Sequence, residues 1–186
     1  MTSKAGWCVW ITGLPGSGKS VVAQALQESL RRHDIEAQVL SSDALRKAVT
    51  PDPTYTEEER DIFYGALALV AKHLTENGIN VIVDATGNRR RYRDTARRMI
   101  PFFIEAYLKC SLEVCMERES KRGKTFQAPR NIYRRAQNGE AQTVPGVGVP
   151  YEEPLHAEVT INPERLSPRK CAQRIYETIT KTFQNH

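Results

Sequence analysis

The stretch WITGLPGSGKSVVAQAL (residues 10–26) places three glycines and a proline between an apolar run and a run with helical periodicity. Within it, Gly13, Gly18, Lys19 and Ser20 satisfy the pattern G-x-x-x-x-G-K-[ST] of a phosphate-binding loop. Backbone N–H groups can surround a polyphosphate closely only where no Cβ intrudes, which accounts for the glycines. The alternative is an ordinary glycine-rich turn between a strand and a helix.

The residues on either side of the loop favour phosphate binding. Upstream, residues 7–12 (WCVWIT) have the aromatic and β-branched composition of a buried strand, and downstream apolar residues recur at helical spacing. A helix N-terminus would then add partial positive charge beside the phosphates. We predict that Lys19 reaches the β- and γ-oxygens of ATP and that the Ser20 hydroxyl binds Mg²⁺. The predicted ATP-binding residues are Gly13, Leu14, Pro15, Gly16, Ser17, Gly18, Lys19, Ser20, Val21 and Arg118.

Length and composition favour one compact domain over residues 1–186. The chain is 40% hydrophobic and 26% charged, which is typical of globular proteins, and it contains no apolar run of the ~20 residues that a membrane span needs. Its N-terminus lacks the pattern of a signal peptide. The four cysteines form no C-x-x-C pair and therefore predict reduced residues of a cytoplasmic protein.

The chain has a net charge of +5, and its Lys and Arg residues are concentrated in two segments, residues 88–98 and 121–135. Two local clusters downstream of a phosphate loop fit a small anionic substrate better than a nucleic-acid footprint, although solvated helix faces would give the same pattern. A GTP-driven switch would need a guanine-reading N-K-x-D element, and the sequence has none. These observations favour a kinase of a small anionic compound.

Strands alternate with helices along the rest of the chain. Strands are predicted at residues 35–43, 79–88, 102–110 and 157–163, and helices at 56–78, 111–122, 131–137 and 167–183, with an arginine-rich helix ending near residue 99. This order predicts a doubly wound parallel α/β sheet with helices on both faces. Ligands of such sheets bind outside the carboxyl ends of the strands, so the residues after each strand are the informative ones.

Two acids follow predicted strands. Asp43 comes after the second strand, with Arg46 one helical turn later, and Asp84 ends the run VIVD, the pattern of a Walker B element. Phosphoryl transfer needs Mg²⁺ across the β- and γ-oxygens, cations on the spreading charge and a carboxylate that accepts a hydroxyl proton. We predict Asp43 as this base and Asp84 as a Mg²⁺-site residue; the alternative for Asp43 is a helix N-cap.

A basic segment from Arg118 to Tyr151, which we place at about residues 118–154, has the composition of a lid. Its cations could reach over the transferring phosphate, while Gly139, Gly146 and Gly148 supply hinge freedom. Closure of the lid would exclude water from the site. A kinase whose site stays open to water hydrolyses ATP instead.

The motifs GLPGSGKS, SSDALR, YTEEER, LEVCMER and PRNIYRRAQNGEAQTVPGVGVPYEEP, in this order, resemble the adenylylsulfate kinase family of phosphate-loop kinases. The resemblance runs from about residue 13 to residue 154, and residues 129–154 are its most specific part. It implies transfer of the γ-phosphate of ATP to the 3′-hydroxyl of adenosine 5′-phosphosulfate in sulfate activation. It also implies Mg²⁺ as cofactor, ATP and adenylylsulfate as small-molecule partners, no membrane or nucleic acid, and leaves room for a homodimer.

The resemblance also implies which residues bind the acceptor. Tyr55 matches an aromatic that stacks on the substrate adenine, and Arg130 matches a lysine near the phosphosulfate. Phe63 stands where the family has an asparagine, and Val144 replaces the lid phenylalanine that closes the adenine sandwich. Residues of roughly 120–128 form an insertion. The predicted acceptor-binding positions are Asp43, Arg46, Tyr55, Phe63, Arg90, Arg130 and Val144.

These departures leave the acceptor less well specified than the nucleotide. Losing a stacking aromatic removes on the order of 1–3 kcal/mol of base recognition. The segment DATGNRR (84–90) also resembles phosphate-loop kinases that act on other small-molecule or nucleic-acid hydroxyls. A related kinase with a different acceptor is therefore the alternative function.

Overall fold

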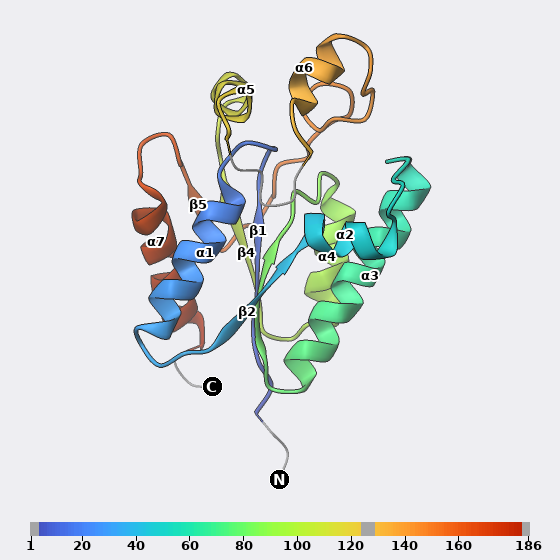
Figure 1. Ribbon diagram of the computed structural model, residues 1–186. Coiled ribbons are helices and arrows are strands. Elements are labelled where there is room, and N and C mark those ends of the chain that lie inside the picture. Colours follow the sequence, from blue (N-terminus) through green and yellow to red (C-terminus); the bar gives the residue numbers. More distant parts are fainter. Residues whose placement is uncertain (1–3, 124–128, 184–186) are drawn as a thin grey trace.

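A computed structural model describes residues 4–123 and 129–183 and shows a five-stranded parallel sheet in the order β2-β3-β1-β4-β5 (Figure 1). The strands are β1 (Cys8–Thr12), β2 (Ala37–Ser41), β3 (Asn80–Asp84), β4 (Phe103–Leu108) and β5 (Val159–Ile161). The helices are α1 (Lys19–Arg31), α2 (Ser42–Val49), α3 (Glu57–Glu76), α4 (Arg90–Met99), α5 (Leu112–Ser120), α6 (Ile132–Gln137) and α7 (Pro168–Phe183). The predicted fold class is confirmed.

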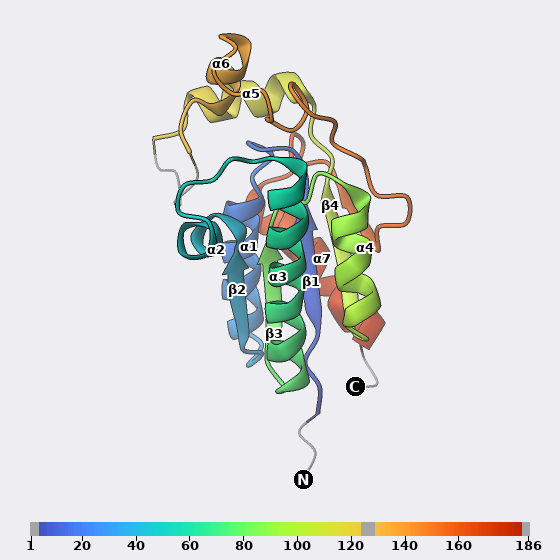
Figure 2. The ribbon, with the colours of Figure 1, turned by 90° about the vertical axis from the view of Figure 1, so that its right-hand side faces the viewer.

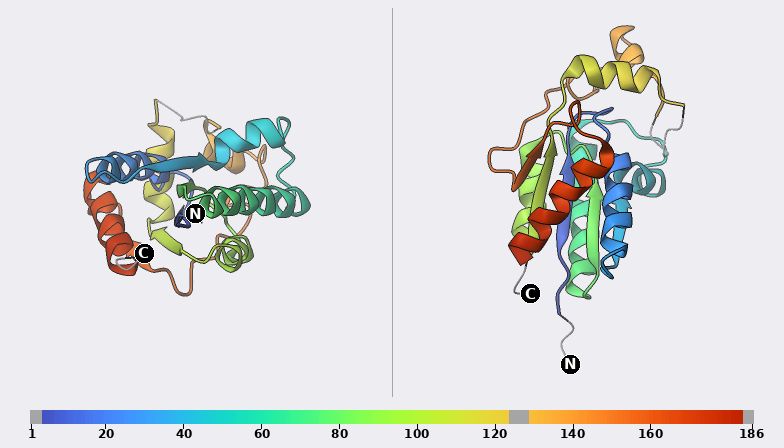
Figure 3. Two further views of the ribbon diagram at one scale, coloured as in Figure 1. Left: turned by 90° about the horizontal axis from the view of Figure 1, so that it is seen from below. Right: turned by 90° about the vertical axis from the view of Figure 1, so that its left-hand side faces the viewer.

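Two helical layers cover the sheet because side chains of β1 alternate between its faces. Val9 and Ile11 belong to the apolar cluster with α1 and α7, whereas Cys8 and Trp10 belong to the cluster with α3 and α4. Figure 3, seen from below, shows these helix pairs on opposite sides of the sheet. Every residue of β1 is buried, which explains why its sequence is a continuous apolar run rather than an alternating one.

The strands end earlier than the sequence predicted. Ser41 pairs in register with Asp84, so β2 and β3 finish level with each other at the carboxyl edge. Helix α2, which was not predicted, begins directly after β2, and the Ser41 hydroxyl accepts a hydrogen bond from the N–H of Ala44. Ser41 therefore caps α2, and Asp43, the alternative cap, lies in its first turn.

The remaining helices match the predicted order closely. Thr56 caps α3, as its Oγ1 accepts a hydrogen bond from the Glu59 N–H, and Ser167 accepts one from Lys170 at the start of α7. Helices α5 and α6 lie above the carboxyl ends of the strands, at the end of the molecule opposite the termini (Figure 2). In the described ranges, no helix combines the length and the apolar character that crossing a bilayer requires.

A buried ion pair ties this upper end to the sheet. Arg93 of α4 is 1% exposed and its Nε donates to Glu105 of β4 at 2.5 Å. The same guanidinium donates to the carbonyls of Gly87 and Glu152, so it joins the loop after β3 to the segment that returns from α6. One side chain thus fixes three separate parts of the chain.

We expect Arg93→Ala to lower the free energy of unfolding by about 3–5 kcal/mol, because the buried Glu105 carboxylate would keep only its 3.4 Å contact with Arg97 Nη2. Arg91→Ala is the matched control: Arg91 lies on the same helix and pairs with Glu57 and Asp61, but its side chain is 51% exposed. Exposed pairs contribute only about 0–1 kcal/mol. Urea denaturation of both variants checks this, and equal losses would contradict it.

Candidate active site

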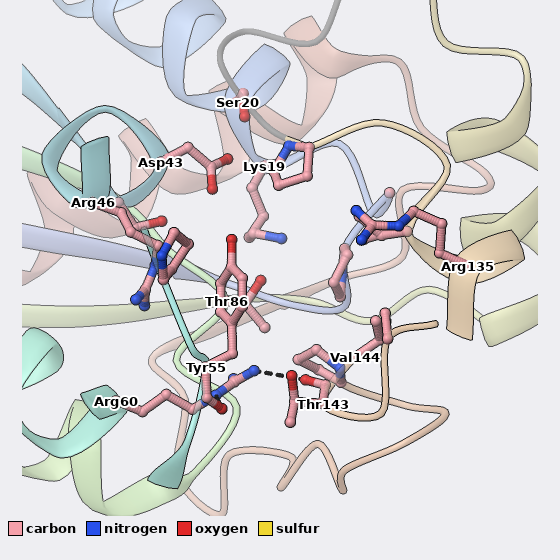
Figure 4. A pocket seen from close by; sticks show the side chains of 18 of the residues that line it. Lys19, Ser20, Asp43, Arg46, Tyr55, Arg60, Thr86, Arg135, Thr143 and Val144 are labelled. Atoms are coloured by element: carbon pink, nitrogen blue, oxygen red, sulfur yellow. Dashed lines mark hydrogen bonds between the residues drawn. The ribbon is translucent and has the colours of Figure 1, made fainter. Parts of the chain in front are cut away.

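A cavity of about 900 Å³ opens at the carboxyl edge of the sheet, between the loop after β1 and the segment that follows α6. Figure 4 shows Lys19 and Asp43 on one side of this space and Thr143, Val144 and Arg135 on another. Its lining includes Pro15, Gly16, Gly18, Lys19, Ser20, Val21, Asp43, Arg46, Tyr55, Arg60, Asp84, Thr86, Arg118, Arg122, Arg135, Thr143 and Val144. The cavity volume lies in the upper range of pockets that enclose small ligands.

The loop between β1 and α1 has no room for side chains at two of its glycines. A Cβ on Gly16 would lie 2.3 Å from the Cys115 carbonyl oxygen of α5, and one on Gly13 would lie 2.7 Å from the carbonyl oxygen of Leu108. Both glycines have positive φ, +84° and +151°. The Tyr133 hydroxyl of α6 also donates to the Pro15 carbonyl at 2.8 Å. The loop is therefore wedged against β4, α5 and α6.

One cation and two acids face each other beside this loop. The Lys19 ammonium donates to the carbonyls of Gly13 (3.1 Å) and Leu14 (3.0 Å), and burial lowers its pKa while Asp84 and Asp43 oppose that shift. Burial raises the pKa of Asp84, against the effects of Lys19 and of a hydrogen bond with Ser20. Burial, followed by repulsion from Asp84, raises the pKa of Asp43. Burial thus favours the neutral form of all three groups, whereas the attraction between Lys19 and the two acids favours their charged forms.

The oxygen groups near Lys19 fit a magnesium ion. Ser20 and Asp84 offer a hydroxyl and a carboxylate within hydrogen-bonding reach of each other. No group of three or more His, Cys, Asp or Glu side chains suited to a metal occurs within residues 4–123 and 129–183. Mg²⁺ commonly takes one or two carboxylates and completes its shell with substrate phosphates and water, so this sparse donor set agrees with that ion.

One helical turn after Asp43 on α2, Arg46 is held between aromatic rings. Its guanidinium carbon lies 3.8 Å from the centroid of Phe63 and 5.1 Å from that of Tyr55, and its Nη1 pairs with Glu59 at 2.8 Å. Phe63 is fully buried. Glu59 also accepts a hydrogen bond from the Tyr55 N–H, where the backbone has φ +56°. Packing, cation–π contact and ion pairing together fix the guanidinium of Arg46 at the cavity wall.

Arg60 is a cavity residue that sequence reasoning missed. It is 7% exposed, and its three nitrogens donate to the Tyr55 carbonyl (Nε, 3.1 Å), Asn88 Oδ1 (Nη1, 3.0 Å) and the Thr143 carbonyl (Nη2, 2.6 Å). Figure 4 shows the last of these bonds. The helical spacing of α3 could have indicated it. Arg60 continues the buried face that Tyr64 and Leu67 form, and a cation on a buried face needs polar partners.

Three predicted acceptor residues lie away from the cavity among the described residues. Phe63 lies beneath Arg46. Arg90 contacts Glu152: its Nε lies 3.8 Å from Oε2, and its backbone N–H donates to the same oxygen. Arg130 is exposed and its Nη2 donates to the Gly123 carbonyl at 3.4 Å. Their roles in acceptor binding stay predictions, and this geometry does not support direct contact.

The other predicted site residues lie in or beside the cavity. Gly13, Leu14 and Ser17 shape the loop without lining the cavity, whereas Asp43, Arg46, Tyr55 and Val144 line it. Arg118 lines it too, although one of its nitrogens donates to the Pro163 carbonyl at 2.9 Å.

Arg122 adds positive charge to this cluster. It opposes the pKa rise of both Asp43 and Asp84 and adds to the lowering of the Lys19 pKa. Its Nε is buried and has no hydrogen-bond partner in the described part of the chain. Residues 124–128 of the predicted insertion, Lys124 included, lie outside the described residues.

Fold and site together define a phosphate-loop kinase. A strand, a glycine-rich loop and a helix place Lys19 and Ser20 beside two strand-end acids, under helices that carry arginines. The family model described as adenylylsulphate kinase matches residues 5–162. The chain therefore belongs to the adenylylsulfate kinase family.

Individual relatives agree with this assignment. The adenylyl-sulfate kinase of Rippkaea orientalis is 32% identical over 96% of this chain and 90% of its own length. The structure of the Mycobacterium tuberculosis APS kinase in complex with AMPPNP and APS is similar with a TM-score of 0.84 and 30% identity, covering 94% of this chain and 98% of the other. A gluconokinase from Sinorhizobium meliloti shares only the fold, with a TM-score of 0.65 and 21% identity, over 99% of both chains.

We expect Gly16→Ala to weaken ATP binding by more than tenfold, because its methyl group would force the loop away from the Cys115 carbonyl. Gly139→Ala is the matched control: Gly139 also has positive φ (+77°), but an added Cβ there would meet nothing within 4 Å. Both variants carry the left-handed strain of about 1–2 kcal/mol, so only the contact differs. Calorimetric titration with ATP checks this, and similar affinities in both variants would contradict it.

Proposed function

We propose that this protein transfers the γ-phosphate of ATP to the 3′-hydroxyl of adenosine 5′-phosphosulfate. The observation that carries the proposal is one cavity that brings Lys19, Asp43 and Asp84 together with Tyr55 and two fixed arginines, Arg46 and Arg60. The family assignment and the likeness to an enzyme in complex with AMPPNP and APS support it.

The reaction is an in-line displacement at the γ-phosphorus. The acceptor hydroxyl oxygen forms the new bond to phosphorus, the bond from phosphorus to the β,γ-bridging oxygen breaks, and ADP leaves. The hydroxyl proton passes to the Asp43 carboxylate. Burial and the neighbouring Asp84 raise the pKa of Asp43, which makes it a stronger base than an exposed aspartate.

Charge at the phosphates is the second contribution. Lys19, now bonded to the carbonyls of Gly13 and Leu14, would turn to the β- and γ-oxygens of ATP. Ser20 and Asp84 would hold Mg²⁺, which neutralises charge on the same oxygens when it is bound. Arg122 and Arg135 line the cavity from the lid side and add positive charge around the transferred group.

The acceptor would lie between α3 and the segment that follows α6. The Tyr55 ring offers a surface for stacking an adenine, with Val144 across the cavity, and Arg46 and Arg60 offer guanidinium groups to an anionic phosphosulfate. Burial raises the pKa of the Tyr55 hydroxyl, so the ring stays neutral at physiological pH. An acceptor that is both aromatic and anionic fits this wall better than a sugar acid does.

We also propose a reducing, cytoplasmic compartment. All four cysteines, Cys8, Cys110, Cys115 and Cys171, are buried free thiols, and burial raises the pKa of each. The single-domain organisation and a homodimer stay predictions.

Acceptor identity is tested by ADP release from ATP with adenylylsulfate or gluconate. We expect turnover with adenylylsulfate alone. Tyr55→Ala should raise the KM for adenylylsulfate about tenfold, and Val144→Phe should lower it about fivefold, on the scale of one stacked base. The KM for ATP should stay unchanged in both variants. Absence of adenylylsulfate-dependent turnover, or indifference to both substitutions, would rule out this acceptor.

The role of Asp43 is tested by the pH dependence of kcat. Because the pKa of Asp43 is raised, activity should fall as the pH drops through a value above the ordinary aspartate range, where the base becomes protonated. Asp43→Asn should lower kcat about 10²-fold and remove this acidic limb. Asp84→Asn is the comparison variant and should instead raise the Mg²⁺ concentration needed. An identical defect in both would refute the division of roles.

A further inference from the structure

Asn88 occupies the loop between β3 and α4 and is 2% exposed. Both ends of its amide are used: Oδ1 accepts from Nη1 of Arg60 at 3.0 Å, and Nδ2 donates to the Pro150 carbonyl at 3.1 Å. Its own carbonyl accepts the Glu152 N–H at 2.8 Å. The mechanism derived above assigns no role to this buried amide.

Arg60 extends the same chain of hydrogen bonds to a second point. Its Nη2 donates to the Thr143 carbonyl at 2.6 Å. Residues 143–150, the return loop, are closed on themselves, since the Val144 carbonyl accepts from the N–H groups of residues 147, 148 and 149. The pair of Arg60 and Asn88 therefore holds both ends of a compact loop that lines the cavity at Thr143 and Val144.

This arrangement determines where the Arg60 guanidinium points. A guanidinium has five N–H donors in a fixed plane. Three of the five are directed to the Tyr55 carbonyl, Asn88 and the Thr143 carbonyl, so the plane is fixed at the wall of the cavity that Arg60 lines. Without Asn88, Nη1 would lose its acceptor, and only the bonds to the Tyr55 and Thr143 carbonyls would hold the guanidinium.

We propose that Asn88 is a positioning residue for the acceptor. It orients Arg60 toward the anionic group and couples this orientation to closure of the return loop. The inference rests on the proposed function for the identity of the acceptor. If Asn88 were purely structural, its substitution would lower stability and would not affect the KM for the acceptor more than the KM for ATP.

Steady-state kinetics separate the two roles. Asn88→Ala should raise the KM for adenylylsulfate about tenfold, the usual effect of a lost hydrogen bond to a charged group, with the KM for ATP unchanged. Asn80→Ala is the matched control: Asn80 begins β3, the strand that precedes the loop of Asn88, and also uses both ends of its amide, with Trp7 N–H and the Glu36 carbonyl. It should leave the KM for adenylylsulfate unchanged. Equal effects of both substitutions would overturn the proposal.

Two further variants identify Arg60 as the intermediary. In an Arg60→Ala background, Asn88→Ala should change the KM for adenylylsulfate by less than twofold, because the group it orients is gone. A full additional tenfold effect would overturn the proposal. The isosteric Asn88→Asp keeps the side-chain volume but places a negative charge against Arg60. The carboxylate still accepts from Arg60 but cannot donate to the Pro150 carbonyl, and its charge offsets that of Arg60 toward an anionic acceptor. The KM for adenylylsulfate should therefore rise at least as far as in the alanine variant, and an unchanged value would count against the proposal.

Amide hydrogen exchange of the ligand-free protein gives a test without any acceptor. Exchange across residues 143–150 should rise about tenfold in Asn88→Ala and stay at the wild-type rate in Asn80→Ala. An unchanged return loop in Asn88→Ala would overturn the proposal. If wild type fails to turn over adenylylsulfate, the proposed function is wrong, and the exchange result still decides whether Asn88 holds the return loop.

Discussion

Backbone N–H groups can approach a polyphosphate only where the chain carries no side chain, and this constraint extends well beyond the loop that obeys it. Gly16 has no Cβ, so the Cys115 carbonyl of α5 can lie against it, and Gly13 is packed in the same way against Leu108 at the end of β4. Helix α5, from which the lid segment starts, therefore packs against the phosphate loop. Tyr133 adds a third contact by donating to Pro15. Because of these contacts, the position of α5 and α6 follows from the geometry of the nucleotide site.

The second organising feature is the level ending of the parallel strands. Ser41 and Asp84 are register partners, and Ile11 pairs with the same aspartate, so the residues that follow β1, β2 and β3 emerge at one edge. This brings Lys19, Asp43 and Asp84 close enough to shift one another's pKa. Lys19 and Arg122 both oppose the rise in the pKa of the two acids. A bound cation such as Mg²⁺ would act in the same direction and would favour the ionised form of Asp84.

The sequence predicted which residues meet around the phosphate loop better than it predicted the rest of the cavity lining, for a physical reason. The phosphate loop is a local feature: its glycines, Lys19 and Ser20 are contiguous, and the constraint on each is set by its neighbours in the chain. The position of Asp84 at a strand end was likewise predicted from the continuous apolar run that precedes it. The proposed acceptor wall is assembled from α2, α3 and the return loop. Arg60 and Thr143 are 83 positions apart in the chain, so no local sequence pattern predicts their contact.

The predicted positions that lie outside the cavity have the same origin. Position-by-position comparison placed Phe63 and Arg90 in the acceptor site, but it could not show that Phe63 packs beneath Arg46 or that Arg90 faces Glu152. Helix α2 was missed because eight residues after a strand give little periodic signal. By contrast, the long helix α3 and its Thr56 cap were predicted, since twenty residues carry several turns of the pattern.

Phe63 marks a difference between the proposed acceptor site and the family pattern. Where that pattern has an asparagine, a fully buried ring lies 3.8 Å from the Arg46 guanidinium. A ring cannot donate or accept at the substrate, but it fixes a cation in place through its face. Arg46 is thus oriented by stacking and by Glu59, whereas Arg60 is oriented by Asn88 and two carbonyls. Tyr55 belongs to both arrangements, because its ring lies against Arg46 and its carbonyl accepts from Arg60, so the two cations of this wall are coupled through one residue.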